Sequence, residues 1–289
     1  LEMLYDSVPE VLSELIRTSF IPKGGYKFIV ADFSSIERVV LAWLAGERWV
    51  LDAYNRKEDL YIATASQMFN VPIDKINKKD PLRQKGKVAD LACGYGGSVG
   101  ALIAMGALDM GLNEEELRPL VNAWRSANPN IVSFWWDVDR ATIKAVREKT
   151  TTKTHGIVFS YQSGMLFIKL PSSRHLSYVK PRIEINQFGS DCVTYEGIIG
   201  AKKWDRIQSY GPKFVENIVQ AISRDILCYA MENLKHFKIV MHIHDEIIIE
   251  AEKNVSVDSI CETLGQTPPW AKGLKLRAEG FESYFYKKD

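Results

Sequence analysis

The sequence predicts an α+β fold in which an antiparallel sheet is combined with a large helical part. Short apolar runs rich in β-branched residues lie near both ends of the chain, at 27–31, 239–241 and 247–249. Such runs are typical of buried strands. Most residues from about 44 to 150 instead have helical patterns. We therefore expect the strands and the helices in largely separate stretches of the chain.

The composition is that of a soluble globular protein. Its 289 residues suffice for one large domain or two smaller ones, and 46% of them are apolar while 25% are charged. No run of about 18 apolar residues and no signal peptide is apparent. The four cysteines have no metal-type spacing, so we expect a reduced, cytoplasmic protein. The net charge of +1 argues against binding nucleic acid by bulk charge, although 75–87 is locally basic.

The first expected strand, which follows a helical lead-in at 8–18, ends on a carboxylate. Asp32 comes directly after the apolar run at 27–31, and 34–37 opens a helical run that stops at Gly46. Ser34 and Glu37 have the spacing of a capping box, so capping the helix would suffice to explain Glu37. A turn at the end of the strand would likewise explain Asp32. Nothing in the spacing shows that Asp32 meets the acidic residues near 245.

A basic helix is expected from Pro81 to the glycines at 94, 96 and 97. Arg83 and Lys87 are four residues apart, so they share a helix face at a spacing of roughly 6 Å. Leu91 continues this stripe, and Tyr95 lies at its flank. Two such cations could bind phosphates. A solvated basic face is the alternative interpretation.

The later part of the chain predicts further helices and a second β-rich stretch. A helix start is expected at 110–117, an amphipathic helix at 212–235, and a β-hairpin insertion in the polar stretch near 151–190. The large aromatic residues of the helical part are expected in the core rather than as base-stacking platforms: Trp124, Phe134, Trp135 and Trp136.

The most informative stretch is 238–250, KIVMHIHDEIIIE. Two apolar runs flank a charged triplet, His244-Asp245-Glu246, which contains neither glycine nor proline and is therefore a poor choice for a simple turn. Adjacent carboxylates beside a buried sheet cost desolvation energy unless a partner offsets it. A divalent cation such as Mg²⁺ would be that partner. A hairpin with a solvated acidic tip is the alternative.

Together these stretches resemble the three signature motifs of family A DNA polymerases, the group of bacterial polymerase I and many phage enzymes. The first motif resembles 32–37, the second resembles Arg83, Lys87, Leu91 and Tyr95-Gly96, and the third resembles 244–246, in the family's order. Further phage-like segments extend the resemblance over nearly the whole chain. The resemblance implies a template-directed DNA polymerase, with primer-template DNA and dNTPs as partners, in phage replication or repair.

The resemblance also implies roles for individual residues. Asp32, Asp245 and the backbone carbonyl of Phe33 would hold two Mg²⁺ ions, which Mn²⁺ can replace, with Glu246 behind them. Arg83 and Lys87 would bind the triphosphate, and Lys87 would protonate the leaving group. Further residues would surround the nucleotide: Ser35, Glu37, Tyr61, Leu91 and Tyr95. Others would contact the DNA: Gly96, Ser98, Asn217, Gln220 and His244.

Several positions depart from the family pattern. Many relatives carry an arginine at the position of Val39, whereas this chain has its arginine one position earlier, at Arg38. Leu91 replaces an aromatic residue of polymerase I, Asp90 replaces a frequent Asn, and Ser173 replaces a usual Gly. None of these changes removes an expected metal ligand or phosphate-binding cation.

By the resemblance, 1–43 and 206–289 form the palm, and 44–205 form mainly helical fingers with the hairpin near 151–190. Only 31 residues precede Asp32, so neither a thumb nor an exonuclease domain fits before it. We therefore expect a truncated chain, a proteolytic fragment or a split-polymerase subunit whose partner chain carries thumb and exonuclease. The alternatives are a non-catalytic DNA-binding subunit, a metal-dependent nuclease and a related phage-type RNA polymerase.

Overall fold

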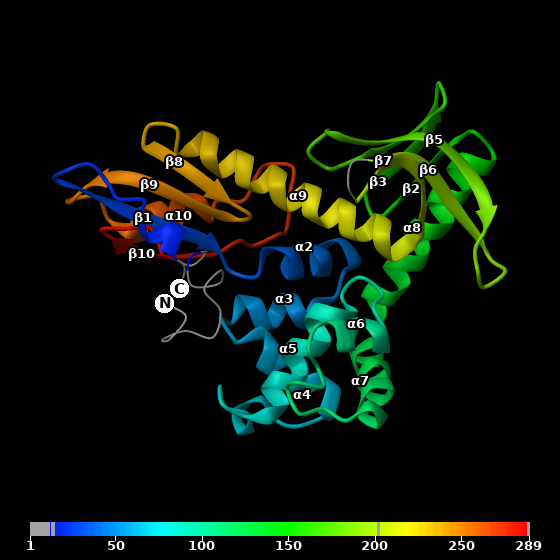
Figure 1. Ribbon diagram of the computed structural model, residues 1–289, viewed down its shortest axis with the longest axis horizontal. Coiled ribbons are helices and arrows are strands. Elements are labelled where there is room, and N and C mark those ends of the chain that lie inside the picture. The colour runs from blue at the N-terminus through cyan, green and yellow to red at the C-terminus, as the bar shows by residue number, and fades with distance from the viewer. Residues whose placement is uncertain (1–11, 13–14, 201–202, 288–289) are drawn as a thin grey trace. The chain divides into compact units, whose positions relative to one another are not determined.

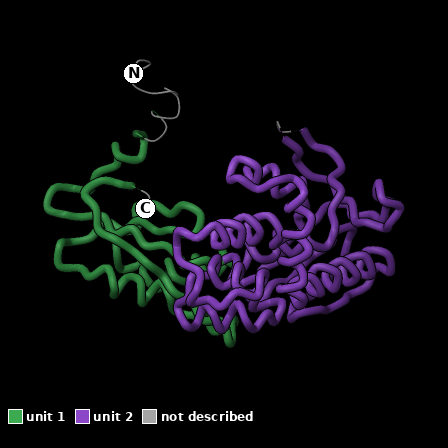
Figure 2. Tube along the Cα trace, turned by 90° about the horizontal axis from the view of Figure 1, so that it is seen from below, with its two compact units in different colours: residues 1–36, 223–289 green, residues 37–222 purple. Residues whose placement is uncertain are grey.

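The computed structural model describes residues 12, 15–200 and 203–287. The chain forms two compact units, which comprise 1–36 with 223–289 (unit 1) and 37–222 (unit 2), as Figure 2 shows in two colours. The expected lead-in helix at 8–18 lies largely outside the described residues. Its described residues, 12 and 15–18, are helical. In the described part of the chain, no helix is both long and apolar enough to cross a membrane.

Unit 1 contains a four-stranded antiparallel sheet in the order β10-β1-β9-β8 (Figure 1). The strands are β1 (Tyr26–Phe33), β8 (Lys238–Ile243), β9 (Glu246–Glu252) and β10 (Ala278–Ser283), and the helix α10 (Val257–Leu264) packs against β1 and β10. The three apolar runs of the sequence fall in β1, β8 and β9, so the prediction of strands there is confirmed.

The two inner strands, β1 and β9, carry the core of unit 1. Ile247, Ile248 and Ile249 are all 0% exposed, and β1 is buried from residue 27 to residue 31. Because successive side chains of a strand point to opposite faces, burial of consecutive residues means that both faces of the sheet are covered. This explains why these strands are continuous apolar runs rather than alternating ones.

Unit 2 begins with helices whose ends are set by side chains (Figure 1). Asp59 and Asp80 accept hydrogen bonds from backbone N–H groups at the starts of two helices, Pro81 occupies a first helical turn, and Asn113 forms a capping box with Glu116. The expected starts at Pro81 and within 110–117 are confirmed. The helices are α2 (Ile36–Ala45), α3 (Arg48–Asn55), α4 (Leu60–Phe69), α5 (Pro81–Cys93), α6 (Val99–Ala104), α7 (Glu114–Ala127) and α8 (Pro129–Arg147), with a 3₁₀ turn, η1 (Ile73–Lys75).

Aromatic side chains fill the helical core of unit 2. Trp124 and Trp135 are 0% and 1% exposed, and their rings stack with centroids 5.9 Å apart. Phe134, which precedes Trp135 in the sequence, is also fully buried. The predicted core role of these three residues is therefore confirmed. The same prediction is wrong for Trp136, which is 47% exposed because it lies on the outer side of α8.

A six-stranded antiparallel sheet follows, in which each strand pairs with its neighbour in sequence. Its strands are β2 (Thr151–Thr154), β3 (Ile157–Gln162), β4 (Met165–Lys169), β5 (His175–Ile185), β6 (Asp191–Ile199) and β7 (Lys203–Ser209). The predicted hairpin insertion near 151–190 is too small, because the sheet has six strands and extends to residue 209. The long helix α9 (Gly211–Asn233) then leads from unit 2 into unit 1.

Candidate functional site

Four carboxylates lie at one end of the sheet of unit 1: Asp32, Asp245, Glu246 and Glu279, which pairs with Asp32 from β10. Asp32, near the end of β1, lies directly opposite Glu246, the first residue of β9. Directly paired residues of antiparallel strands point to the same face, with Cβ atoms about 5 Å apart. Asp245 immediately precedes Glu246 in the turn between β8 and β9. The pairing therefore brings together acidic residues that are more than 200 positions apart, which the sequence spacing alone could not show.

The turn that carries Asp245 is strained. Only His244 and Asp245 separate β8 from β9, and His244 has φ +54°. A positive φ in a residue other than glycine costs on the order of 1 kcal/mol, and such residues concentrate at functional sites. His244 is exposed, whereas Asp245 is half-buried. The alternative of a simple solvated tip does not explain why a strained histidine stands where glycine would fit.

Glu246 is buried and held by a tyrosine near the end of the chain. It is 6% exposed, and its Oε1 accepts a hydrogen bond of 2.7 Å from the hydroxyl of Tyr286, which is 2% exposed. The Tyr286 ring packs against Phe28, Val30 and Ile248 on the same face of the sheet. Burial and this hydrogen bond raise the pKa of Tyr286 to about 12, so the hydroxyl stays protonated and keeps donating.

The donor set at this end of the sheet suits a hard divalent cation. Asp32 and Asp245 offer carboxylate oxygens, and Phe33, the last residue of β1, can add its backbone carbonyl. Within the described residues, no group of three or more His, Cys, Asp and Glu side chains is arranged to hold a metal ion. Two carboxylates nevertheless fit Mg²⁺, which commonly uses one or two of them and completes its shell with water and substrate phosphates.

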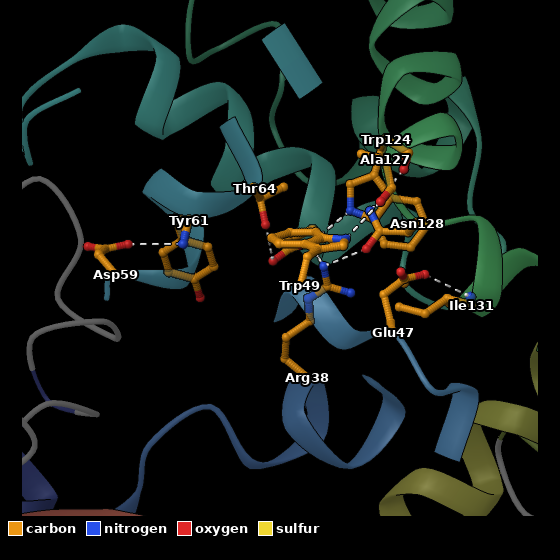
Figure 3. Close-up of polar contacts among 12 residues, drawn as sticks. Arg38, Glu47, Trp49, Asp59, Tyr61, Thr64, Trp124, Ala127, Asn128 and Ile131 are labelled. Carbon is orange, nitrogen blue, oxygen red and sulfur yellow. Dashed lines mark hydrogen bonds and ion pairs between the residues drawn. The ribbon is translucent and has the colours of Figure 1, made fainter. Parts of the chain in front are cut away.

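The cations of α5 lie beside Tyr61 in unit 2. The guanidinium of Arg83 lies 5.4 Å and the ammonium of Lys87 lies 6.0 Å from the centre of the Tyr61 ring. Arg83 donates from Nε to Asp59 Oδ2 at 2.9 Å, while the other oxygen of Asp59 caps α4 through the backbone N–H of Tyr61 (Figure 3). Lys87 has no acidic partner in the part of the chain that the structure describes.

Glu37 and Tyr95 form a second contact around α5. The Tyr95 hydroxyl donates to Glu37 Oε2 at 2.8 Å, and burial together with the Glu37 charge raises the pKa of Tyr95 far above its ordinary value. The capping-box interpretation of Glu37 is wrong, because α2 begins at Ile36 and Ser34 is not its N-cap. Ser35, the residue before α2, has φ +55°. Leu91, the expected nucleotide contact of α5, is 51% exposed.

The residues expected to contact DNA are distributed over both units. In unit 2, Gly96 has φ +78°, and a Cβ there would lie 2.6 Å from Pro212. Ser98 accepts a hydrogen bond of 3.0 Å from Arg118, and Asn217 donates to the hydroxyl of Tyr178 at 3.0 Å. Gln220, in α9, is exposed and also belongs to unit 2, whereas His244 belongs to unit 1.

Comparison with known proteins identifies the family. The family model described as DNA polymerase family A matches residues 7–267. A DNA polymerase of Bacillus phage SP02 is 52% identical over 294 aligned residues that include the whole of this chain. The chain belongs to DNA polymerase family A. The predicted resemblance is thereby confirmed.

Two proteins of lower identity are also similar to this chain. The DNA polymerase I of Caldicellulosiruptor bescii is 25% identical over 82% of this chain. The polymerase domain of Pol1 from M. smegmatis, solved in complex with DNA primer-template and dNTP, covers 93% of this chain with a TM-score of 0.62 and 21% identity. This likeness shows the α+β fold. The chain spans 45% of the phage relative, 24% of the C. bescii relative and 42% of the solved chain.

Two departures from the family A pattern compensate each other. Arg38 lies 3.1 Å from Asp90 and donates to Asn128 at 2.8 Å, and its guanidinium also lies over the rings of Trp49 and Trp124 (Figure 3). The Asp90 side chain accepts further hydrogen bonds from Thr64 and Trp124. Arg38 thus neutralises the carboxylate of Asp90.

Sequence reasoning missed two residues that hold the expected site residues in place. Asp59 pairs with Arg83. The sequence indicated Asp59 only as a possible helix cap, because it stands just before the helical run at 60–69. Tyr286 holds Glu246 from the end of the chain, and no pattern in the sequence pointed to it. Both contacts join segments that are distant in sequence.

Proposed function

We propose that this chain is the catalytic core of a template-directed DNA polymerase that adds dNTPs to a primer 3′ end and releases pyrophosphate. The observation that carries this proposal is the pairing of Asp32 with Glu246, the residue after Asp245, at one end of the sheet in unit 1. Membership of family A supports it, as does the solved relative bound to primer-template DNA and dNTP. A binding-only subunit has no need of these carboxylates together with the cations of α5.

In this proposal, Asp32, Asp245 and the Phe33 carbonyl hold two Mg²⁺ ions. When bound, the ions stabilise the attacking and leaving oxygens of an in-line displacement. Glu246, fixed by Tyr286, contributes negative charge behind the ligands without moving toward them. Mn²⁺ offers similar chemistry to the same oxygen ligands.

The residues of unit 2 bind the nucleotide. Lys87 binds a phosphate oxygen and donates a proton to the departing pyrophosphate, a role that suits an ammonium without an acidic partner among the described residues. Arg83 turns part of its forked donor set from Asp59 to the triphosphate. Tyr61 lines the proposed triphosphate site beside these two cations. Glu37 and Tyr95, joined by their hydrogen bond, border the sugar of the nucleotide and disfavour ribonucleotides. Ser35 and Leu91 are proposed as further residues that contact the nucleotide.

The template-primer contacts are proposed for residues of both units: Gly96, Ser98, Asn217, Gln220 and His244. Because the chain spans less than half of its phage relative, a separate or continuing chain that carries a thumb and an exonuclease is a further proposal. A role in phage replication or repair and a cytoplasmic location are likewise proposals.

Primer extension on a defined DNA template tests the proposal, with Mg²⁺ and with dNTPs compared with rNTPs. We expect extension by dNTPs that Asp245→Asn abolishes and that Asp258→Asn, an exposed control in α10, leaves unchanged. Lys87→Gln should reduce extension far more than Lys85→Gln, whose side chain pairs with Glu116 at 2.7 Å. A folded chain that extends no primer, alone or with an added thumb fragment of a related polymerase, would refute the proposal in favour of a non-catalytic subunit.

A further inference from the structure

The six-stranded sheet of unit 2 has one covered face and one open face. The side chains of Ile157, Phe159, Leu166 and Ile168 are 0% exposed, and α8 packs against strands β2, β3, β5 and β6. Alternation along each strand places the intervening residues on the opposite face. We call this opposite face the outer face; by the pairing register it includes Lys153, Phe167, Lys169, His175, Trp204 and Arg206. Cys192 and Thr194 also belong to it but are buried, in contact with Gln208 and Arg206, so the open part lies around the six residues named first.

We infer that the outer face binds single-stranded nucleic acid by stacking bases on its aromatic rings and holding phosphates with its cations. The face contains none of the residues assigned to nucleotidyl transfer, so this inference stands apart from the proposed chemistry.

A row across four strands of the outer face contains three basic side chains, on β2, β4 and β5, with Val158 of β3 between them. Lys153 pairs with Val158, Val158 with Lys169, and Lys169 with His175, so these residues lie side by side across β2 to β5. Lys153, Lys169 and His175 are all exposed. Neither lysine has an acidic partner in the described ranges, so both ammonium groups are available to an anion in solution.

A half-buried aromatic ring lies in the next row. Phe167 is flanked across the strands by Ser160 and Ser177, whose side chains are short. The ring of His175 meets Phe167 edge-on, with centroids 6.3 Å apart and planes at 89°. Bases stack on such rings with little dependence on sequence, because each base has a flat π-face.

Trp204, in β7, provides a second ring. It is 55% exposed, and its Nε1 donates to Glu196 Oε2 at 3.1 Å. Lys180 and Arg206 also contact Glu196, at 2.9 and 3.4 Å, so this carboxylate is neutralised while it fixes the edge of the indole. The hydrogen bond uses the ring edge and leaves a ring face open for stacking.

The charge of the sheet favours a polyanion. Residues 151–209 contain eight Lys and Arg against four Asp and Glu, a net charge of +4, whereas the whole chain carries +1. The rest of the chain is therefore acidic. A single strand fits better than a duplex, because only unpaired bases can turn toward Phe167 and Trp204.

The test measures binding of a fluorescent oligo(dT) to the full chain at several salt concentrations. Lys153→Gln/Lys169→Gln should lower the affinity and reduce the salt slope by about 1.4, which corresponds to two fewer phosphate contacts. Trp204→Ala should weaken binding about 5- to 150-fold, and Trp204→Phe should restore most of the loss. Trp136→Ala, an exposed tryptophan of α8, and Lys144→Gln/Lys275→Gln, an exposed lysine pair, are matched controls that should bind as the original chain does.

Two further arms decide the location and the form of the ligand. Photocrosslinking with 5-iodouracil oligonucleotides should label peptides that contain Phe167, His175 or Trp204, and blunt duplex DNA should bind Trp204→Ala and the original chain equally well. Unchanged affinity and salt slope in the variants, or crosslinks found only outside 151–209, would overturn the inference. An equal loss of duplex binding in Trp204→Ala would overturn its single-strand part. Circular dichroism of each variant separates these outcomes from misfolding.

Discussion

Replacing Tyr286 by phenylalanine should loosen the strands that carry the acidic motif. Tyr286→Phe keeps the buried ring but leaves Glu246 Oε1 without its 2.7 Å donor in a place that is 6% exposed. A hydrogen bond to a charged group contributes about 1.5–3 kcal/mol. The equilibrium for opening β1 and β9 should therefore rise about 10- to 150-fold.

Hydrogen–deuterium exchange of peptides from β1 and β9 measures this change directly. Tyr284→Phe is the matched control, because Tyr284 is 65% exposed and should change stability by no more than about 0.5 kcal/mol. Equal exchange in the Tyr286→Phe variant and the original chain would show that the hydrogen bond does not hold Glu246, and it would remove Tyr286 from the site.

Three further predictions concern pH and packing. The pKa of Tyr286 is raised from 10 to about 12, so its stabilising effect should be complete below pH 10 and lost as the pH rises through 12; the gap in urea midpoint to Tyr286→Phe should close over that interval. Gly86→Ala should lower the free energy of unfolding by about 1–3 kcal/mol, because its Cβ would lie 2.4 Å from the Tyr61 carbonyl oxygen, whereas Gly100→Ala has nothing within 4 Å and should be neutral or stabilising. Asp90→Asn should cost about 3 kcal/mol by leaving Arg38 unbalanced, and in a double-mutant cycle with Arg38→Gln the two losses should not add; full additivity would contradict the pairing.

The sequence predicted elements wherever local pattern and burial agree. The apolar runs around Asp32 and Asp245 became strands because both faces are buried, and Pro81 began α5 because its missing N–H costs nothing at a helix start. The extent of the sheet at 151–209 was not apparent, since its strands mix polar and apolar residues and one face is open. Contacts between segments that are distant in sequence, such as those of Arg38 and Tyr286, depend on tertiary packing, which the spacing of residues does not encode.

The two sheets also differ in when they can form during synthesis. In the sheet of unit 2 every strand pairs with the next strand along the chain, so β2 to β7 can assemble as each hairpin is completed. By contrast, the two neighbours of β1 in its sheet are β9 and β10, which follow it by more than 200 residues. The apolar segment from Phe28 to Ala31 therefore leaves the ribosome long before either neighbour exists. Until then its backbone edges are open to other chains, which makes β1 the segment where chaperone binding or aggregation of the nascent protein should concentrate.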